Sequence, residues 1–141
     1  MPWGLAKMKK LPAKIQFISI AETPLNPSEC PEKVRAALSN VLDNGMIEVK
    51  HGRVIGRAIG SESLNTIYEQ VRSRAALGVL RKALLNNRTM DSTWFLLNKQ
   101  AAAAGTVVIV EHKDESPLGA IKITIECDEL DTVIDWLSPV A

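Results

Sequence analysis

The sequence lacks the features that mark membrane and secreted proteins. None of its apolar runs reaches the roughly 18 residues that a membrane-spanning helix needs. The N-terminus carries Lys7, Lys9 and Lys10 but no apolar stretch long enough for a signal peptide. Its two cysteines, Cys30 and Cys127, provide neither a CxxC motif nor a disulfide framework. We therefore expect a soluble, cytoplasmic protein with reduced thiols and no membrane partner.

The motifs of common enzymes, metal sites and nucleotide sites are also missing. There is no GxxxxGKS or GxxxxGKT loop for phosphates, no GxSxG nucleophile turn and no HExxH zinc pair. His51 and His112 fall in predicted loops, and neither has a histidine or cysteine partner at ligand spacing. We therefore expect no enzyme, no metal and no cofactor.

Aromatic residues and net charge are both scarce. Aromatics make up 4% of the chain, so the core must consist mainly of Ile, Val, Leu and Ala, with little surface for base stacking. We expect Trp94 and Trp136 as core or interface anchors. The 17 basic and 16 acidic residues leave a charge of +1 and a pI of about 7.8. Dedicated nucleic-acid binders have a pI above about 9, so only local separation of charge would create a site for RNA.

The apolar pattern predicts one α+β domain over residues 14–141, after a flexible N-terminal tail at 1–13. Alternating apolar residues indicate strands, and apolar residues at i, i+3, i+4 and i+7 indicate helices. Their mixed order favours an antiparallel sheet with helices packed on one face. In chain order we predict a strand at 14–21, a helix from 31 to about 42, a β-hairpin at 46–59, one long helix at 61–88, a short strand and helical turns within 91–105, a pair of strands at 106–111 and 120–126, and a last helix ending before Pro139.

The helix predicted at 61–88 is unusually basic, with no acidic residue between Glu69 and Asp91. Gly78 is its weakest point. At about 100° per residue, Arg74, Arg81 and Arg88 fall within about 40° of one another on its surface. Guanidinium groups in such a row suit phosphate oxygens, so these arginines are candidates for RNA binding.

Two other interpretations of these arginines stay open. A charged stripe opposite an apolar stripe is common on the surface helices of soluble proteins. In addition, residues 111–135 hold eight acidic and two basic residues, a net charge of −6. The arginines can therefore pair with acids of the same molecule, or with those of a second copy.

Asn98, Lys99 and Gln100 form a second candidate site. These three polar side chains stand between an apolar strand and the small residues Ala101 to Gly105, which allow close approach of a ligand to the backbone. They can present donors to a phosphate, a sugar or a base edge. The alternative is that Asn98 caps the following helical turn while the alanines pack tightly.

Several segments give the sequence a resemblance to a known family. The stretch FLLNKQAA at 95–102, followed by Gly105, precedes SPLG at 116–119 and the strand Ile121 to Ile123. Together with PEKV at 31–34 and IDWLSP at 134–139, these segments resemble archaeal uncharacterised protein family 0201. The resemblance implies an archaeal, cytoplasmic α+β protein that forms homodimers, with a fold like that of the ribosomal protein that binds 5S ribosomal RNA. Family members are often labelled RNA-binding, and no catalytic residues carry over.

Three hypotheses about function follow. In the first, the protein associates with RNA, without catalysis, through the basic helix and the segment Asn98 to Gln100. In the second, it is a homodimeric interaction or assembly module whose basic and acidic segments meet, with no nucleic acid. In the third, Asn98 to Gln100 forms a small-ligand or enzymatic site.

Overall fold

One six-stranded antiparallel sheet organises residues 15–140, the part of the chain that the computed structural model describes. The tail predicted at 1–13 lies outside the described residues. The strands lie in the order β2-β3-β1-β6-β4-β5. In chain order the elements are β1 (Ile18–Pro24), α1 (Pro31–Val41), β2 (Met46–Lys50), β3 (Arg53–Ile59), α2 (Asn65–Ser73), α3 (Leu77–Asn86), β4 (Ser92–Asn98), α4 (Lys99–Ala103), β5 (Ile109–Val110), β6 (Ala120–Glu126) and α5 (Leu130–Leu137), with short 3-10 turns at Ser61–Leu64 and Lys113–Glu115.

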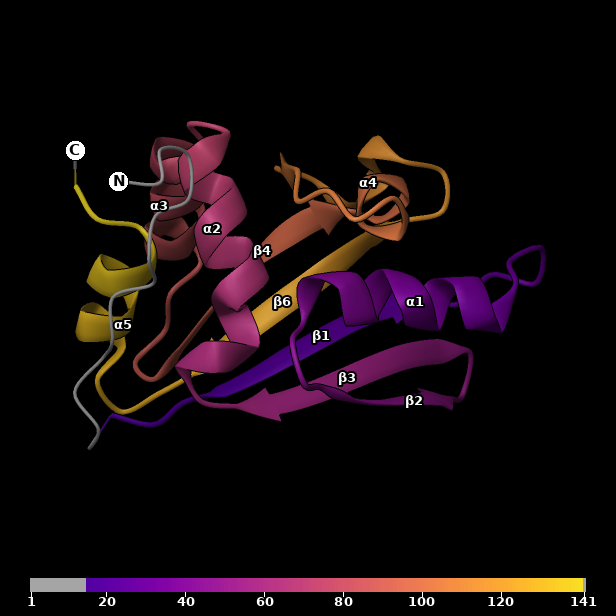
Figure 1. Ribbon diagram of the computed structural model, residues 1–141, viewed down its shortest axis with the longest axis horizontal. Coiled ribbons are helices and arrows are strands. Elements are labelled where there is room, and N and C mark those ends of the chain that lie inside the picture. Colours follow the sequence, from indigo (N-terminus) through magenta and orange to yellow (C-terminus); the bar gives the residue numbers. More distant parts are fainter. Residues whose placement is uncertain (1–14, 141) are drawn as a thin grey trace, which may run out of the picture.

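The helices of residues 15–140 share one hydrophobic core on one face of the sheet (Figure 1). Alternate strand residues point into this core: Ala21 of β1, Val54 of β3 and Ile123 of β6 are fully buried. Trp136 of α5 joins the core, with its ring centroid 6.0 Å from that of Phe17. The predicted α+β class, antiparallel sheet and one-sided helical cover are confirmed. The likeness to the ribosomal protein stays a prediction.

The hairpin β2–β3 forms where the sequence predicts it. His51 and Gly52 both adopt positive φ, 51° and 75°, as a tight two-residue turn between twisted strands requires. At the outer edge of the sheet, Arg35 of α1 donates a hydrogen bond of 3.3 Å to the carbonyl oxygen of Ile47 in β2. A side chain thus covers one of the backbone groups at this edge.

The prediction of a single long helix at 61–88 is wrong. The segment forms a 3-10 turn and two helices, α2 and α3, which are separated at Ala75. Ala75 has a φ of 55°, whereas Gly78 lies inside α3. The turn at Ala75 redirects the chain so that Val71 of α2 and Leu80 of α3 are both fully buried. A single straight helix would not bury both side chains.

The region around residues 91–126 is partly as predicted. The strand followed by a helical turn is confirmed as β4 and α4, and Gly105 ends the turn with a φ of 83°. The strand predicted at 106–111 shrinks to the two residues of β5, which pair with Leu96 and Leu97. β6 does not adjoin β5, because it lies between β1 and β4.

Candidate nucleic-acid interface

The three candidate arginines do not form a row on one helix. Arg74 follows the end of α2, Arg81 lies in α3, and Arg88 lies just beyond the end of α3. The turn at Ala75 changes the direction of the chain between the first and the second. The predicted geometry of the arginine row is therefore wrong, because the break in the helix removes the common axis on which it depends.

Acidic residues of α5 hold two of these arginines. Arg81 Nη1 lies 2.8 Å from Asp135 Oδ1 and also donates to the carbonyl oxygen of Ser138. Arg88 pairs in the same way with Asp131. These contacts are the intramolecular pairing that the sequence left open, and they place both guanidinium groups between α3 and α5. Arg74 is exposed, and its side chain has no hydrogen bond or ion pair with any other residue within 15–140.

Arg72, two residues before Arg74, also contacts α5. Its guanidinium carbon lies 3.4 Å from the centroid of the Tyr68 ring. It donates hydrogen bonds of 3.0 and 3.2 Å to the carbonyl oxygens of Trp136 and Leu137 at the end of α5. Burial lowers the pKa of Arg72, but a guanidinium group stays charged at ordinary pH. Much of the positive charge of this segment thus fixes α5 to the core.

Asn98 and Lys99 also have structural partners. Asn98 Oδ1 accepts a 2.8 Å hydrogen bond from the amide of Ala101, so it caps α4 as the alternative interpretation states. Lys99 is 3% exposed, and its ammonium group donates to Glu29 Oε1 at 2.8 Å and to the carbonyl oxygens of Pro24 and Leu118. The Lys99 side chain is therefore turned away from solvent.

The Lys99–Glu29 pair is protected from water on both sides, with side-chain exposures of 4% and 11%. Burial alone raises the pKa of Glu29, but hydrogen bonds from Lys99 and Asn26 outweigh it and hold the pKa below its usual value. Gln100 is the exposed member of the segment, and its side-chain oxygen accepts a hydrogen bond from Ser116. A role of this segment, or of the three arginines, in binding RNA stays a prediction.

The outward face of the sheet carries a second group of cations. We call it the open face, because the helices of residues 15–140 all pack on the opposite side (Figure 1). The strand register places four basic and three acidic side chains on it: Lys50, Arg53, Arg57 and Lys122, with Glu22, Glu48 and Glu126. Only the pair Arg53–Glu22 lies within ion-pair distance, at 3.6 Å. The open face is therefore mixed in charge, with basic groups available to a ligand.

A row of outward side chains crosses four strands of the open face. Arg57 is in register with Ile20, Ile20 with Thr124, and Thr124 with Trp94. At about 4.8 Å between strands, the row spans roughly 14 Å. Lys122 stands beside its far end, with the ammonium nitrogen 4.8 Å from the centroid of the Trp94 ring. Cations thus lie near both ends of a stretch that contains an aromatic ring.

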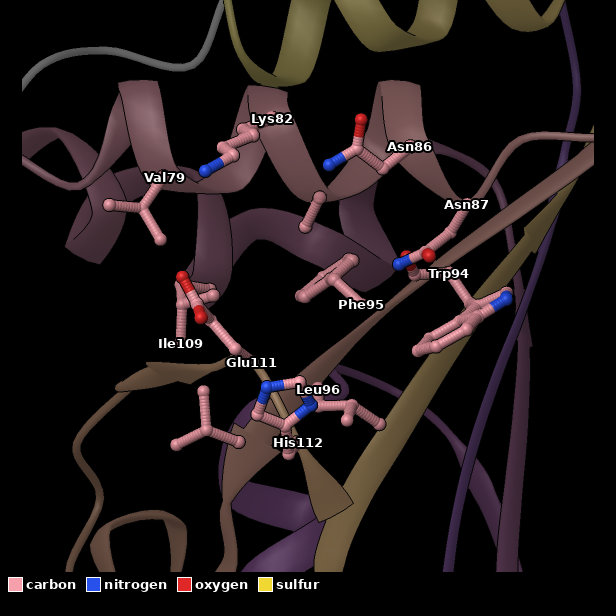
Figure 2. A pocket seen from close by; sticks show the side chains of 12 residues that line it. Val79, Lys82, Asn86, Asn87, Trp94, Phe95, Leu96, Ile109, Glu111 and His112 are labelled. Atoms are coloured by element: carbon pink, nitrogen blue, oxygen red, sulfur yellow. The ribbon is translucent and has the colours of Figure 1, made fainter. Parts of the chain in front are cut away.

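A groove of about 340 Å³ opens where α3 passes the edge of β4 (Figure 2). It exists because β5 is short, so that residues 92–95 of β4 have no strand beside them on that side within the described chain. Apolar side chains form most of its inner wall: Val79, Ala83, Phe95 and Ile109. Polar groups surround them: Lys82, Asn86, Asn87, Glu111 and His112.

A second hollow, of about 670 Å³, lies on the open face beside this groove. The two hollows share Trp94, Leu96, Glu111 and His112, so they meet at the edge of the sheet. The second hollow adds the basic residues Arg53, Lys113 and Lys122 and the acidic residues Glu22 and Asp114. A path therefore leads from the apolar groove to a part of the open face with charges of both signs.

The residues predicted from the sequence to bind RNA include none of the basic residues of the open face. Arg57 and Lys122 alternate with buried Ala58 and Ile123, a pattern that signals that they point outward. Trp136 is 8% exposed and is a core anchor, as predicted. Trp94 is only half-buried and faces outward. Its position in the alternating pattern of the strand is the sequence signal for this outward orientation.

The described residues offer no sign of two other kinds of site. Within residues 15–140, no group of three His, Cys, Asp or Glu side chains is placed to hold a metal ion. No helix in the same range combines the length and the apolar character needed to cross a bilayer.

Comparison with known proteins supplies the family. Residues 20–127 match the model of a family described as RNA binding. UPF0201 proteins of Sulfurisphaera tokodaii and Methanothermobacter thermautotrophicus are 37% and 39% identical, over 85% and 84% of this chain and 86% and 88% of theirs. The crystal structure of the UPF0201 protein from Methanococcus jannaschii superposes with a TM-score of 0.73 at 25% identity, over 88% of this chain and 94% of that one. The chain therefore belongs to the archaeal UPF0201 family.

Proposed function

We propose that this protein binds RNA, without catalysis, through the open face of its sheet. One observation carries the proposal: the open face presents Lys50, Arg57 and Lys122 without an ion-pair partner among residues 15–140, whereas Arg81 and Arg88 are held by α5. The family description as RNA binding supports the choice of ligand. Both cysteines are free, which fits a reducing cytoplasm.

The chemistry of the open face suits a few phosphate contacts. Arg57 and Lys122 provide charge near opposite ends of the row, and Ile20, Thr124 and Trp94 provide contact area for sugars and bases between them. The acidic side chains on the same face limit the number of phosphates that are neutralised at once. We therefore expect affinity that depends on salt, but less steeply than in a strongly basic protein.

The test is the double variant Arg57→Gln with Lys122→Gln. Each lost phosphate contact lowers the slope of log affinity against log salt by about 1, so the double variant should lower the slope by about 2. Fluorescence anisotropy with labelled single-stranded and hairpin RNA, over a series of salt concentrations, measures this slope.

Arg74→Gln is the matched control, because it removes one exposed arginine from the helical side. We expect it to leave the slope unchanged. If Arg74→Gln weakens binding as much as the double variant, the contact lies on the helices, as the sequence predicts. If no RNA binds the wild-type protein at low salt, the proposal fails.

A homodimeric assembly module is the second candidate. Three large apolar side chains on the open face are exposed: Met46 at 81%, Ile59 at 74% and Ile18 at 40%. Ile18 and Ile59 are in register, and Met46 lies on the adjoining strand β2. Exposed apolar side chains that cluster in this way are typical of contact surfaces between proteins. A homodimer could bury this patch in each copy.

The variant Met46→Glu tests this candidate. It places a carboxylate in the patch at a position that is already exposed, so the fold should be unaffected. We expect a wild-type dimer at micromolar concentration and a shift of the variant to monomer, as measured by light scattering coupled to size exclusion. A wild-type protein that is monomeric at that concentration rules the candidate out.

A further inference from the structure

The groove between α3 and β4 has the shape and chemistry of a site for a small planar group. Its volume of about 340 Å³ falls within the range of ligand pockets. In Figure 2, Lys82 and Asn86 lie along α3 on one side, and Glu111 and His112 lie on the other, with Phe95 between them. Phe95 is fully buried, so a flat group bound there would place its apolar surface against Val79, Ile109 and the half-buried ring of Trp94, and its edges against the polar rim.

A peptide strand is a poor occupant of this groove. Strand addition needs the free backbone groups along the edge of β4. The amide nitrogen of the Asn87 side chain already donates a 3.0 Å hydrogen bond to the carbonyl oxygen of Trp94. This contact blocks part of the ladder that an added strand would use.

Three lysines near the groove suit a ligand with an anionic backbone. The groove joins the second hollow at Trp94 and His112. Lys82 lines the groove itself, and Lys113 and Lys122 line the second hollow, where Arg53 is paired with Glu22 and the acids Glu111 and Asp114 are also present. A base in the groove would therefore have its sugar and phosphate near these lysines. Donors and acceptors on the Asn86 amide match those on base edges.

We infer that the groove takes one unpaired base and that the protein binds RNA in single-stranded form. The inference rests on the proposed function and narrows its ligand. A base that enters the groove must leave its stack and its pairing partner, which a continuous duplex does not permit. The second hollow holds the phosphate that follows the base, beside Lys113 and Lys122.

The experiment compares labelled oligoadenylate, labelled oligouridylate and the duplex that forms when the two are annealed. The duplex carries the phosphates of both strands, so charge alone would favour it, and tighter binding of either single strand reports on its unpaired bases. We expect each single strand to bind about tenfold more tightly than the duplex, in the range found for one stacked base. Anisotropy titrations at one salt concentration give the three dissociation constants.

The variants Asn86→Leu and Leu85→Gln connect the preference to the groove. Both positions are exposed at the end of α3, but only Asn86 lines the groove. We expect Asn86→Leu to weaken single-strand binding by about tenfold and to leave duplex binding unchanged. Leu85→Gln should change neither single-strand binding nor duplex binding.

Two results overturn the inference while RNA binding by the open face stands. One is a duplex that binds as tightly as its separate strands, and the other is an Asn86→Leu variant that binds single strands like the wild type. Failure of the wild-type protein to bind any of the three RNAs overturns the proposed function as well.

Discussion

Replacing Lys99 by methionine is expected to lower the free energy of unfolding by about 3–5 kcal/mol. The side chain is 3% exposed and joins three segments that are distant in sequence, through Pro24, Glu29 and Leu118. Methionine fills similar space but donates no hydrogen bond. The Glu29 carboxylate then stays buried without its cation. Urea denaturation followed by circular dichroism measures the loss.

The pH dependence of this loss identifies its cause. The pKa of Glu29 is lowered in the folded protein, so its stabilising contribution is complete above the unfolded pKa of about 4.3 and is lost as pH falls through the folded pKa. The difference between Lys99→Met and wild type should therefore be largest at neutral pH and shrink in acid. A difference that stays constant with pH would show that packing, rather than the ion pair, is responsible.

Two further variants serve as controls for Lys99. Gln100→Met changes the next residue, which is exposed, and should alter stability by less than about 0.5 kcal/mol. The double variant Lys99→Met with Glu29→Leu replaces both charges by apolar groups and should recover much of the loss, because no unpaired buried charge remains.

Replacing Arg72 by methionine is expected to lower the free energy of unfolding by about 2–4 kcal/mol. The guanidinium group supplies hydrogen bonds to carbonyl oxygens of Trp136 and Leu137 and stacks on Tyr68. Charged hydrogen bonds contribute about 1.5–3 kcal/mol, and the cation–π contact adds to this. Thermal and urea denaturation both measure the effect. Arg74→Met, two residues further on and exposed, is the control. Equal losses of stability in the two variants would contradict a stabilising role for the contacts of Arg72 with the end of α5.

The fold was predictable where the signal is local. The apolar periodicity of α1 and α5 and the turn residues His51 and Gly52 determine their elements with little help from the rest of the chain. Ala75 shows the limit. Alanine is the strongest helix former, so nothing in its neighbourhood predicts a left-handed turn. The turn is imposed by the burial of residues on both sides of it.

The candidate site was less predictable, because its contacts are distant in sequence. The acidic partners of Arg81 and Arg88 are 54 and 43 residues away in the sequence. Glu29, the partner of Lys99, is 70 residues away. A sequence shows such residues as charges without partners. The groove likewise depends on the shortness of β5, which the apolar run at 106–111 concealed. Strand pairing must be known before either feature can be recognised.

The contact of Arg35 with Ile47 has a consequence for how copies of this protein can associate. Arg35 covers the carbonyl group of Ile47 at one edge of the sheet, and Asn87 covers that of Trp94 at the free part of β4 on the other side. Both edges therefore carry a side chain that hinders the addition of another strand. Growth into a fibre, strand after strand, is thereby disfavoured. Two copies that meet through the patch at Met46 would instead use the same surface on each partner, which closes the assembly at a pair.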